Sequence, residues 1–215
     1  MDIVNGEFED GPLDIETRYN IAPTENVPVL LKNEEGQWQA KDMRWWLVPS
    51  WSKEVSSKYT MFNAKSETLS SSRAFRLPFE RKRCIIPVSG YYEWTKQGKV
   101  KVPYSIQPAQ EKGFLFAGLW DRWKRGDSVI ESCTIITGTA PDSMKDIHPR
   151  VPIHLSPEEI DLWLGAKTDR SSLTALLSPH LRMPLNITPV SSYVSNSRNK
   201  DALCLEALGE TKKVH

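Results

Sequence analysis

The chain has 215 residues, of which 26% are charged and 39% are hydrophobic, and its formal net charge is +1. This balance is typical of a globular protein, and the length allows one large domain or two small ones with a sizeable core. A net charge this close to zero excludes a basic field over the whole surface. Any nucleic acid must therefore be bound by a local patch.

Three cysteines, Cys84, Cys133 and Cys204, are widely spaced and form no CxxC pair, so we expect no zinc site. Cys84 and Cys133 lie in apolar runs and are predicted to be core thiols, as in proteins of a reducing compartment. The sequence shows no signal peptide, no apolar run of about 18 residues and no phosphate-binding glycine loop. We therefore expect an intracellular protein of the cytoplasm, nucleoid or nucleus that contacts no membrane and uses no metal or cofactor.

The chain opens on residues 1–18, which contain six acidic residues and one arginine and are predicted to be a flexible lead-in. Two apolar segments, 27–32 and 37–48, flank a polar turn and predict a β-hairpin. Further on, the pattern predicts a helix over 66–77 with Ser66 as its N-cap.

Two features of this half point to nucleic acid. Trp51 ends the run RWWLVPSW, where its ring either stacks on a base or only packs within a loop. Residues 73–83 hold five cations and one acid, and this is the most basic stretch of the chain. It is either a phosphate-binding surface or an ordinary solvated face. The cations are Arg73, Arg76, Arg81, Lys82 and Arg83.

The segment 81–94, RKRCIIPVSGYYEW, contains an apolar run, a Ser-Gly turn and an aromatic return, which together predict a β-hairpin. In strand alternation Glu93 shares one face with Tyr91 and Thr95. A carboxylate among aromatic side chains is either desolvated, with a raised pKa, or a surface group beside core aromatics.

Later apolar runs predict strands at 103–107, 114–120 and 133–137. The segment 147–152, IHPRVP, has a proline on each side of Arg150, so it is predicted to be stiff and extended. His148 and Arg150 then project the same way. The histidine is either structural or a functional group placed beside an arginine.

Towards the C-terminus, Ser156-Pro157-Glu158-Glu159 forms a capping box with proline at N1 and predicts a helix that ends at Gly165. Residues 169–177 predict a second short helix, and residues 209–215 a disordered tail. Strands dominate and no βαβ alternation is present. We therefore predict an α+β fold, with a single domain over 19–208 built on a curved, largely antiparallel, barrel-like sheet with short helices.

Eight of these segments together resemble the SRAP family of SOS response-associated peptidases, also called abasic-site processing proteins. In chain order they are YNIAPT from Tyr19, RWWLVPSW from Arg44, FNAKSET from Phe62, RCIIPVSGYYEW from Arg83, FAGLWDRW from Phe116, CTIIT from Cys133, IHPRVP from Ile147 and PVSSYV from Pro189. Each segment is weakly specific, but eight in the family's order are a specific match.

The resemblance implies a protein that crosslinks to abasic sites in single-stranded DNA through an N-terminal cysteine, exposed when Met1 is removed. The α-amine of that cysteine forms a Schiff base with the ring-opened sugar aldehyde, and its thiol closes a thiazolidine ring. An α-amine suits this step because its pKa of about 8 leaves more of it neutral at pH 7 than a lysine amine. A 1,2-aminothiol then traps the reversible imine.

The resemblance also implies a catalytic site of three residues. Asn63 would hydrogen-bond near the amine and the sugar, Glu93 would orient the amine and move protons, and His148 would act as acid and base on the sugar ring oxygen. Lys65 stands where the family has an arginine, and would contact phosphate as a point charge. The expected DNA-binding residues are Lys65 and Arg150 on phosphate, Trp51 and Thr137 along the groove, and the basic-stretch residues Arg73 and Arg76.

The chain departs from the family pattern at its start, which reads Met1-Asp2-Ile3 where the family has Met-Cys-Gly-Arg, and no cysteine precedes Cys84. By resemblance a first strand is also missing, so we expect the chain as written to form no thiazolidine. A truncated chain, a wrongly started reading frame, an isoform and a pseudoenzyme all fit this start. Pro149 stands where an aspartate is common, and Trp46 replaces a usual glycine.

Three functions compete. The first is a monomeric SRAP-like protein that binds abasic sites in single-stranded DNA and is impaired in crosslinking. The second is a non-catalytic single-stranded nucleic-acid binding module built from residues 73–83, Trp51 and the turn at 198–200, which would not depend on Glu93. The third is proteolysis, which we disfavour because the sequence shows no persuasive Ser-His-Asp or Cys-His arrangement.

Overall fold

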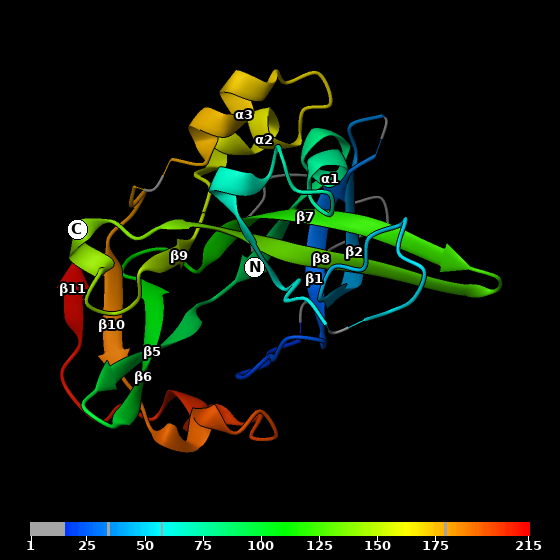
Figure 1. The fold of residues 1–215 in the computed structure, drawn as a ribbon. Coiled ribbons are helices and arrows are strands. Elements are labelled where there is room, and N and C mark those ends of the chain that lie inside the picture. The colour runs from blue at the N-terminus through cyan, green and yellow to red at the C-terminus, as the bar shows by residue number, and fades with distance from the viewer. Residues whose placement is uncertain (1–15, 34, 57, 179) are drawn as a thin grey trace.

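The structure is a computed structural model that describes residues 16–33, 35–56, 58–178 and 180–215. All but the last three residues of the predicted lead-in, residues 1–18, lie outside the described part. Figure 1 shows two sheets with short helices packed above the larger one. Within the described residues, no helix is both long and apolar enough to cross a membrane.

Two sheets and several short helices make up the described chain. The larger sheet contains β1 (Asn26–Lys32), β2 (Trp38–Trp45), β3 (Asn63–Lys65), β4 (Arg83–Val88), β7 (Phe114–Arg125), β8 (Ser128–Thr139) and β9 (Arg150–Pro152). The smaller sheet contains β5 (Tyr91–Gln97), β6 (Val100–Pro108), β10 (Leu185–Pro189) and β11 (Lys212–Val214). The α-helices are α1 (Arg76–Arg81), α2 (Ile160–Leu164) and α3 (Arg170–Leu176). Single 3-10 turns lie at Ser66–Thr68, Asp142–Met144, Pro157–Glu159, Ser192–Ser195 and Ala202–Leu205.

The larger sheet closes on itself. Its order runs β2-β1-β4-β7-β8, and β8 returns to β2 through the parallel pairs Arg44–Ser132 and Trp45–Cys133. The other four pairings of this ring are antiparallel. The predicted α+β class, with a curved, largely antiparallel, barrel-like sheet, is therefore confirmed.

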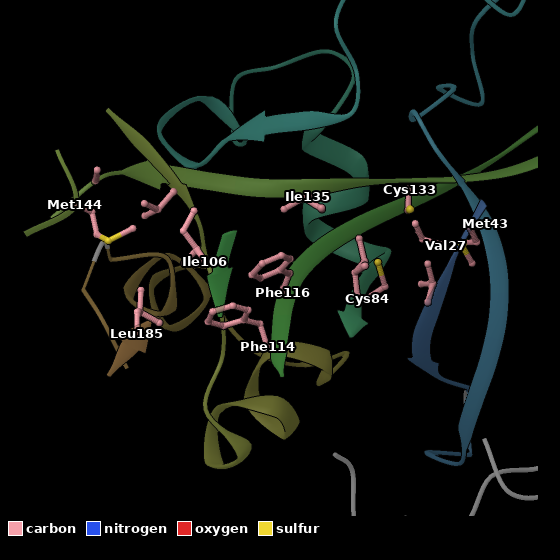
Figure 2. Packing of buried hydrophobic residues seen from close by; sticks show 14 of the residues in the cluster. Val27, Met43, Cys84, Ile106, Phe114, Phe116, Cys133, Ile135, Met144 and Leu185 are labelled. Atoms are coloured by element: carbon pink, nitrogen blue, oxygen red, sulfur yellow. The ribbon is translucent and has the colours of Figure 1, made fainter. Parts of the chain in front are cut away.

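Alternation along the barrel strands divides their apolar side chains between two cores. On β4, Cys84 and Ile86 face the barrel interior, whereas Ile85 faces the layer of helices. Because both faces are covered, the strand is a continuous apolar run with no polar alternation. Figure 2 shows the interior core continuing past Phe116 towards Ile106 of the smaller sheet. The two sheets therefore share one core.

The predicted hairpin at 81–94 is wrong in its pairing. The apolar run β4 pairs with β7 and β1, whereas the aromatic return β5 pairs with β6 in the smaller sheet. The turn between them passes from one sheet to the other. At Gly90 an added Cβ would lie 2.8 Å from the Ile106 carbonyl oxygen, so the crossing needs a residue without a side chain.

Predictions that rest on short-range signals are mostly confirmed. The hairpin at 27–48 forms as β1 and β2, and the capping box at Ser156 is present, with the backbone N–H of Ser156 donating to Glu159. The helix predicted over 66–77 is wrong, because only one 3-10 turn forms there, with Lys65 as its N-cap, before α1 begins at Arg76.

The predicted disordered tail is also wrong. Residues 212–214 form β11, which pairs antiparallel with β10, and the Val214 side chain is buried in the shared core. The segment has too few apolar residues to be recognised from the sequence, because the partner strand supplies its hydrogen bonds and its core.

Arg83 is buried, which removes it from the predicted basic surface. Its guanidinium donates to four backbone carbonyls, those of Phe79, Glu80, Trp163 and Gly165. These bonds fasten α1 and α2 to the start of β4. Burial lowers the pKa of Arg83 from its ordinary value.

Replacement of Arg83 by methionine should destabilise the fold by about 3 kcal/mol or more, since buried carbonyls lose their donors. Arg81 is exposed two residues earlier, and its change to methionine should shift stability by no more than about 0.5 kcal/mol. Urea unfolding of both variants measures the difference. Equal midpoints would contradict the role given to Arg83.

His154 is a second buried polar group, placed where the two sheets meet. It is 5% exposed, it lies against the Phe114 ring, and its Nε2 accepts the Arg182 backbone N–H at 3.1 Å. Burial, aided by the positive charge of Arg182, lowers the pKa of His154 to about 4. The imidazole is therefore neutral in the native protein at pH 7.

Because the unfolded chain takes up a proton near pH 6.5 and the folded one only near 4, stability is full above the unfolded pKa. It should fall between these values by up to about 1.4 kcal/mol per pH unit. His154→Gln should remove that slope, whereas the exposed His215→Gln should keep it. Denaturant unfolding at half-unit pH steps tests this. A slope unchanged in His154→Gln would contradict it.

Candidate functional site

Glu93 and His148 come together from distant parts of the chain. Glu93 lies on β5 of the smaller sheet and His148 lies just before β9 of the larger one. Glu93 Oε1 and His148 Nδ1 are 3.8 Å apart, and their side chains are 22% and 40% exposed. A carboxylate and an imidazole this close, both reached by solvent, can exchange protons with a bound molecule.

The backbone around His148 is held on both sides of the residue. Thr95, which shares the β5 face with Glu93, donates its hydroxyl to the Ile147 carbonyl at 3.0 Å. After Pro149, Arg150 opens β9, which pairs with β8. The extended geometry predicted over 147–152 is confirmed only for Arg150–Pro152, because Ile147 still belongs to the preceding turn.

Glu93 is a carboxylate under electrostatic strain. Burial raises its pKa above the ordinary value, while the neighbouring His148 and the backbone N–H of Trp94 favour the charged form. The aromatic residues on either side of Glu93 in the chain point away from it. Tyr92 and Trp94 pack on the other face of β5 against the cluster of Val190, Val194 and Cys204.

Strand β3 places Asn63 and Lys65 beside the part of β8 that also pairs with β9. The strand is parallel to β8, and Lys65 is paired with Thr137, which is paired on its other side with Pro152 of β9. Asn63 and Lys65 are exposed while Ala64 between them is fully buried. The catalytic residues implied by the family resemblance thus lie on β3, on β5 and just before β9, and β3 and β9 both flank β8.

Arg150 is held by the protein itself. Its guanidinium makes a bidentate ion pair with Glu67, Nη1 to Oε1 at 3.1 Å and Nη2 to Oε2 at 2.9 Å. Its Nε donates to the Thr137 hydroxyl at 3.2 Å, and Nη2 also donates to the Thr137 carbonyl. Thr137 is buried, so it holds Arg150 in place and does not line an open surface.

Trp51 and Arg73 form a separate exposed group. Trp51 is 43% exposed, and the Arg73 guanidinium carbon lies 4.2 Å above its ring. Arg76 is exposed at the start of α1. Within the described residues, no hydrogen bond or ion pair joins this group to Glu93 or His148.

Much of the predicted basic character is used inside the protein. Lys82 is bound to Asp121 at 2.6 Å and Arg83 is buried, so neither adds to an open patch. In the turn at 198–200, Lys200 is bound to Glu25 and to the Asn20 carbonyl. Of the five cations in the stretch 73–83, Arg73, Arg76 and Arg81 remain exposed.

Glu67 and Thr95 are the contacts that sequence reasoning missed. Glu67 follows Asn63 and Lys65 in strict alternation, which is visible in the sequence. The alternation does not show that Glu67 pairs with Arg150. The three cysteines are buried, as predicted for Cys84 and Cys133. Residues 16–33, 35–56, 58–178 and 180–215 hold no group of three or more His, Cys, Asp or Glu side chains that could bind a metal ion.

Replacing Glu93 with glutamine should stabilise the protein at neutral pH. Because the folded pKa of Glu93 lies above the unfolded one, the native state loses stability as pH rises through that folded value. The advantage of the variant in urea unfolding should therefore be present at pH 7 and shrink towards pH 4. Glu111→Gln, at an exposed loop position, is the control. A lower urea midpoint for Glu93→Gln at pH 7 would contradict the destabilising effect of the buried Glu93 charge.

Comparison with known proteins bears on this site. The family described as SOS response associated peptidase (SRAP) matches residues 3–197, and the match begins inside the predicted lead-in. The abasic site processing protein YoqW of Bacillus subtilis is 36% identical over 192 residues, which cover 88% of this chain and 85% of that protein. The abasic site processing protein HMCES of Gallus gallus is 32% identical over 231 residues, covering 91% and 68%.

A solved structure is similar as well. An X-ray structure of a protein from Bacteroides thetaiotaomicron superposes with a TM-score of 0.75 at 27% identity, covering 86% of this chain and 82% of that one. The family match spans most of the sequence, the relatives share about a third of their residues, and the barrel is similar. This chain belongs to the SRAP family.

Proposed function

We propose that this protein binds abasic sites in single-stranded DNA, with the Glu93–His148 pair receiving the damaged sugar. The observation that carries the proposal is the 3.8 Å separation of Glu93 Oε1 and His148 Nδ1 at a partly exposed position. The relatives named as abasic site processing proteins support the choice of ligand. An abasic sugar lacks its base, so it fits a small polar site where an intact nucleotide would be too large.

Each group of the pair has a chemical task. An abasic deoxyribose equilibrates between a closed ring and an open aldehyde, and opening needs a proton on the ring oxygen. His148 supplies that proton, and Glu93, whose burial favours its protonated form, accepts or returns protons beside it. Asn63 is exposed on neighbouring β3 and hydrogen-bonds the sugar hydroxyl or an incoming amine.

Separate groups would hold the DNA strand. Lys65, Arg73 and Arg76 are exposed cations that meet phosphates, and the half-exposed Trp51 ring offers a face for stacking a base. Glu67 and Thr137 accept four of the five N–H donors of the Arg150 guanidinium. Arg150 can therefore donate at most one hydrogen bond to a phosphate. Thr137 contributes by holding Arg150.

The covalent step is the activity that the family resemblance implies. An amine adds to the aldehyde carbon and water leaves as the imine forms; a thiol then adds to the imine carbon and its proton passes to nitrogen. In this chain the three thiols are buried, so none of them is presented to a sugar. We therefore propose that the sequence as printed binds abasic DNA reversibly, and that crosslinking requires a cysteine at the N-terminus.

Binding is tested with a fluorescent single strand that carries one abasic site, against the intact strand. Glu93→Ala should abolish the preference for the abasic strand, because the site loses its proton acceptor. Glu111→Ala should keep the preference, since that carboxylate is exposed in a loop far along the chain. Fluorescence anisotropy measures both affinities.

Retention of the preference by Glu93→Ala would instead favour the alternative, a non-catalytic nucleic-acid binding module. The observation behind that alternative is the Trp51–Arg73 stack, which makes no contact with the pair among the described residues. Such a module would bind intact and abasic strands alike and lose affinity steeply with salt.

Crosslinking is tested by incubating the protein with abasic single-stranded DNA and heating it in denaturant before electrophoresis. The chain as printed should give no stable adduct. The same chain preceded by a family N-terminal segment that begins Cys-Gly-Arg should give one, and a Ser-Gly-Arg version should not, because serine cannot close the thiazolidine. A heat-stable adduct on the printed chain would contradict the reversible binding proposed.

A further inference from the structure

The Arg150–Glu67 pair uses nearly all the hydrogen-bonding capacity of an arginine. A guanidinium has five N–H donors. In the described chain, two meet the Glu67 carboxylate and two meet the hydroxyl and carbonyl of Thr137. Glu67 also accepts the Thr139 hydroxyl at 3.3 Å. The hydrogen bond from Arg150 holds the pKa of Glu67 below its ordinary value, so the pair is ionised at neutral pH.

The same arginine holds the His148 ring through its own peptide groups. His148 Nδ1 lies 2.9 Å from the Arg150 carbonyl oxygen and 3.2 Å from the Arg150 backbone nitrogen. Only Pro149 separates the two residues, so the orientation of the ring follows the backbone of Arg150. That backbone belongs to β9, a strand of three residues whose first residue is Arg150.

The two contacts of Nδ1 suit different proton positions. With a proton on Nδ1, the ring donates to the Arg150 carbonyl and leaves Nε2 free to accept a proton. With Nδ1 bare, the ring accepts the Arg150 N–H and carries its proton on Nε2, ready to give it away. The ring can thus change tautomer without turning, provided that the Arg150 backbone stays in place.

A three-residue strand is a weak support for such a ring. Pairing with β8 fixes β9 on one side, through Thr139 with Arg150 and Thr137 with Pro152. The other support at Arg150 is its side chain, which reaches β8 through Thr137 and the turn after β3 through Glu67. Glu67 is thus the group that ties the His148 segment to the strand carrying Asn63 and Lys65.

We infer that Glu67 is a positioning residue for His148: its carboxylate fixes the Arg150 fork, and the Arg150 peptide in turn holds the imidazole in register with Glu93 and with β3. Glu67 touches neither the imidazole nor the DNA in this scheme. The inference rests on the proposed function for its catalytic consequence, but its structural part stands without any DNA.

The test uses Glu67→Ala, which removes both carboxylate oxygens, and Glu67→Gln, which replaces one of them with an NH2 group, so neither variant can form the bidentate pair. Glu67 is 48% exposed, so both variants should fold. The matched control is Glu80→Ala, which breaks another arginine–glutamate pair, Glu80 with Arg170 at 2.6 Å, on the helical side of the molecule.

The first measurement needs no DNA. The ring nitrogen signals of His148 in nitrogen NMR should move towards those of a free imidazole in both Glu67 variants and stay unchanged in Glu80→Ala. Unchanged His148 signals in the Glu67 variants would overturn the inference.

The second measurement is the affinity for abasic against intact single strands. Displacement of a catalytic group by as little as an ångström is costly, so the preference for the abasic strand should drop about tenfold or more in both Glu67 variants. Moved ring signals with an unchanged preference would support the positioning of His148 and count against the proposed function. The two failures are therefore distinguishable.

A third readout separates positioning from competition for phosphate. If Glu67 merely occupied a phosphate site, its removal would free Arg150 and strengthen binding of the intact strand. The slope of log affinity against log salt would then steepen by about 0.7, one additional phosphate contact on a single strand. We expect the slope to stay unchanged, and a steeper slope with tighter binding would overturn the inference.

Discussion

Strand β8 is the element on which the rest of the structure depends. It pairs with β7, closes the barrel on β2, and carries β3 and β9 along its C-terminal half. Because side chains alternate along each of these strands, fixing their register on β8 also fixes which residues reach the surface. Asn63 and Lys65 on one side of β8 and Arg150 on the other are thereby placed with an accuracy that a loop would not give. Glu93 comes from the smaller sheet, on β5, and it meets His148 because both sheets pack on a common core.

Local signals in the sequence were enough to predict part of this arrangement. The β1–β2 hairpin and the capping box at Ser156 depend on neighbouring residues, and both are visible without the fold. The identity of the pair Glu93 and His148 came from the family resemblance, and the structure brings the two residues together. What could not be predicted depends on partners far along the chain. The run at β4 and the return at β5 were assigned to one hairpin, because nothing in the local pattern shows that a turn passes from one sheet to another. Strand β11 was missed because its hydrogen bonds and its buried contact come from β10 and the shared core, which lie far from it in the sequence.

The positively charged residues likewise could not be assigned from the local sequence alone, because several of their partners lie far along the chain. Residues 73–83 suggest a continuous basic surface, yet Arg83 serves four buried carbonyls and Lys82 is bound to Asp121. Arg150 suggests a phosphate ligand, yet four of its five N–H donors are used by Glu67 and Thr137. A guanidinium has enough donors to act as a structural brace, and burial makes that use costly to disturb. The cations left for a polyanion are the ones without a strong internal acceptor, which only the three-dimensional contacts reveal.

The last strand of the chain has a consequence for how separate molecules behave. β10 has β6 on one side and β11 on the other, and β11 ends the smaller sheet. Lys212 and Lys213 are exposed on this outer strand. Positive charges at a sheet edge repel the edge of a second molecule, which discourages edge-to-edge joining. Strand β11 thus pairs with the backbone amides of β10 that would otherwise form the sheet edge, and its lysines repel the same edge of a second copy of the protein.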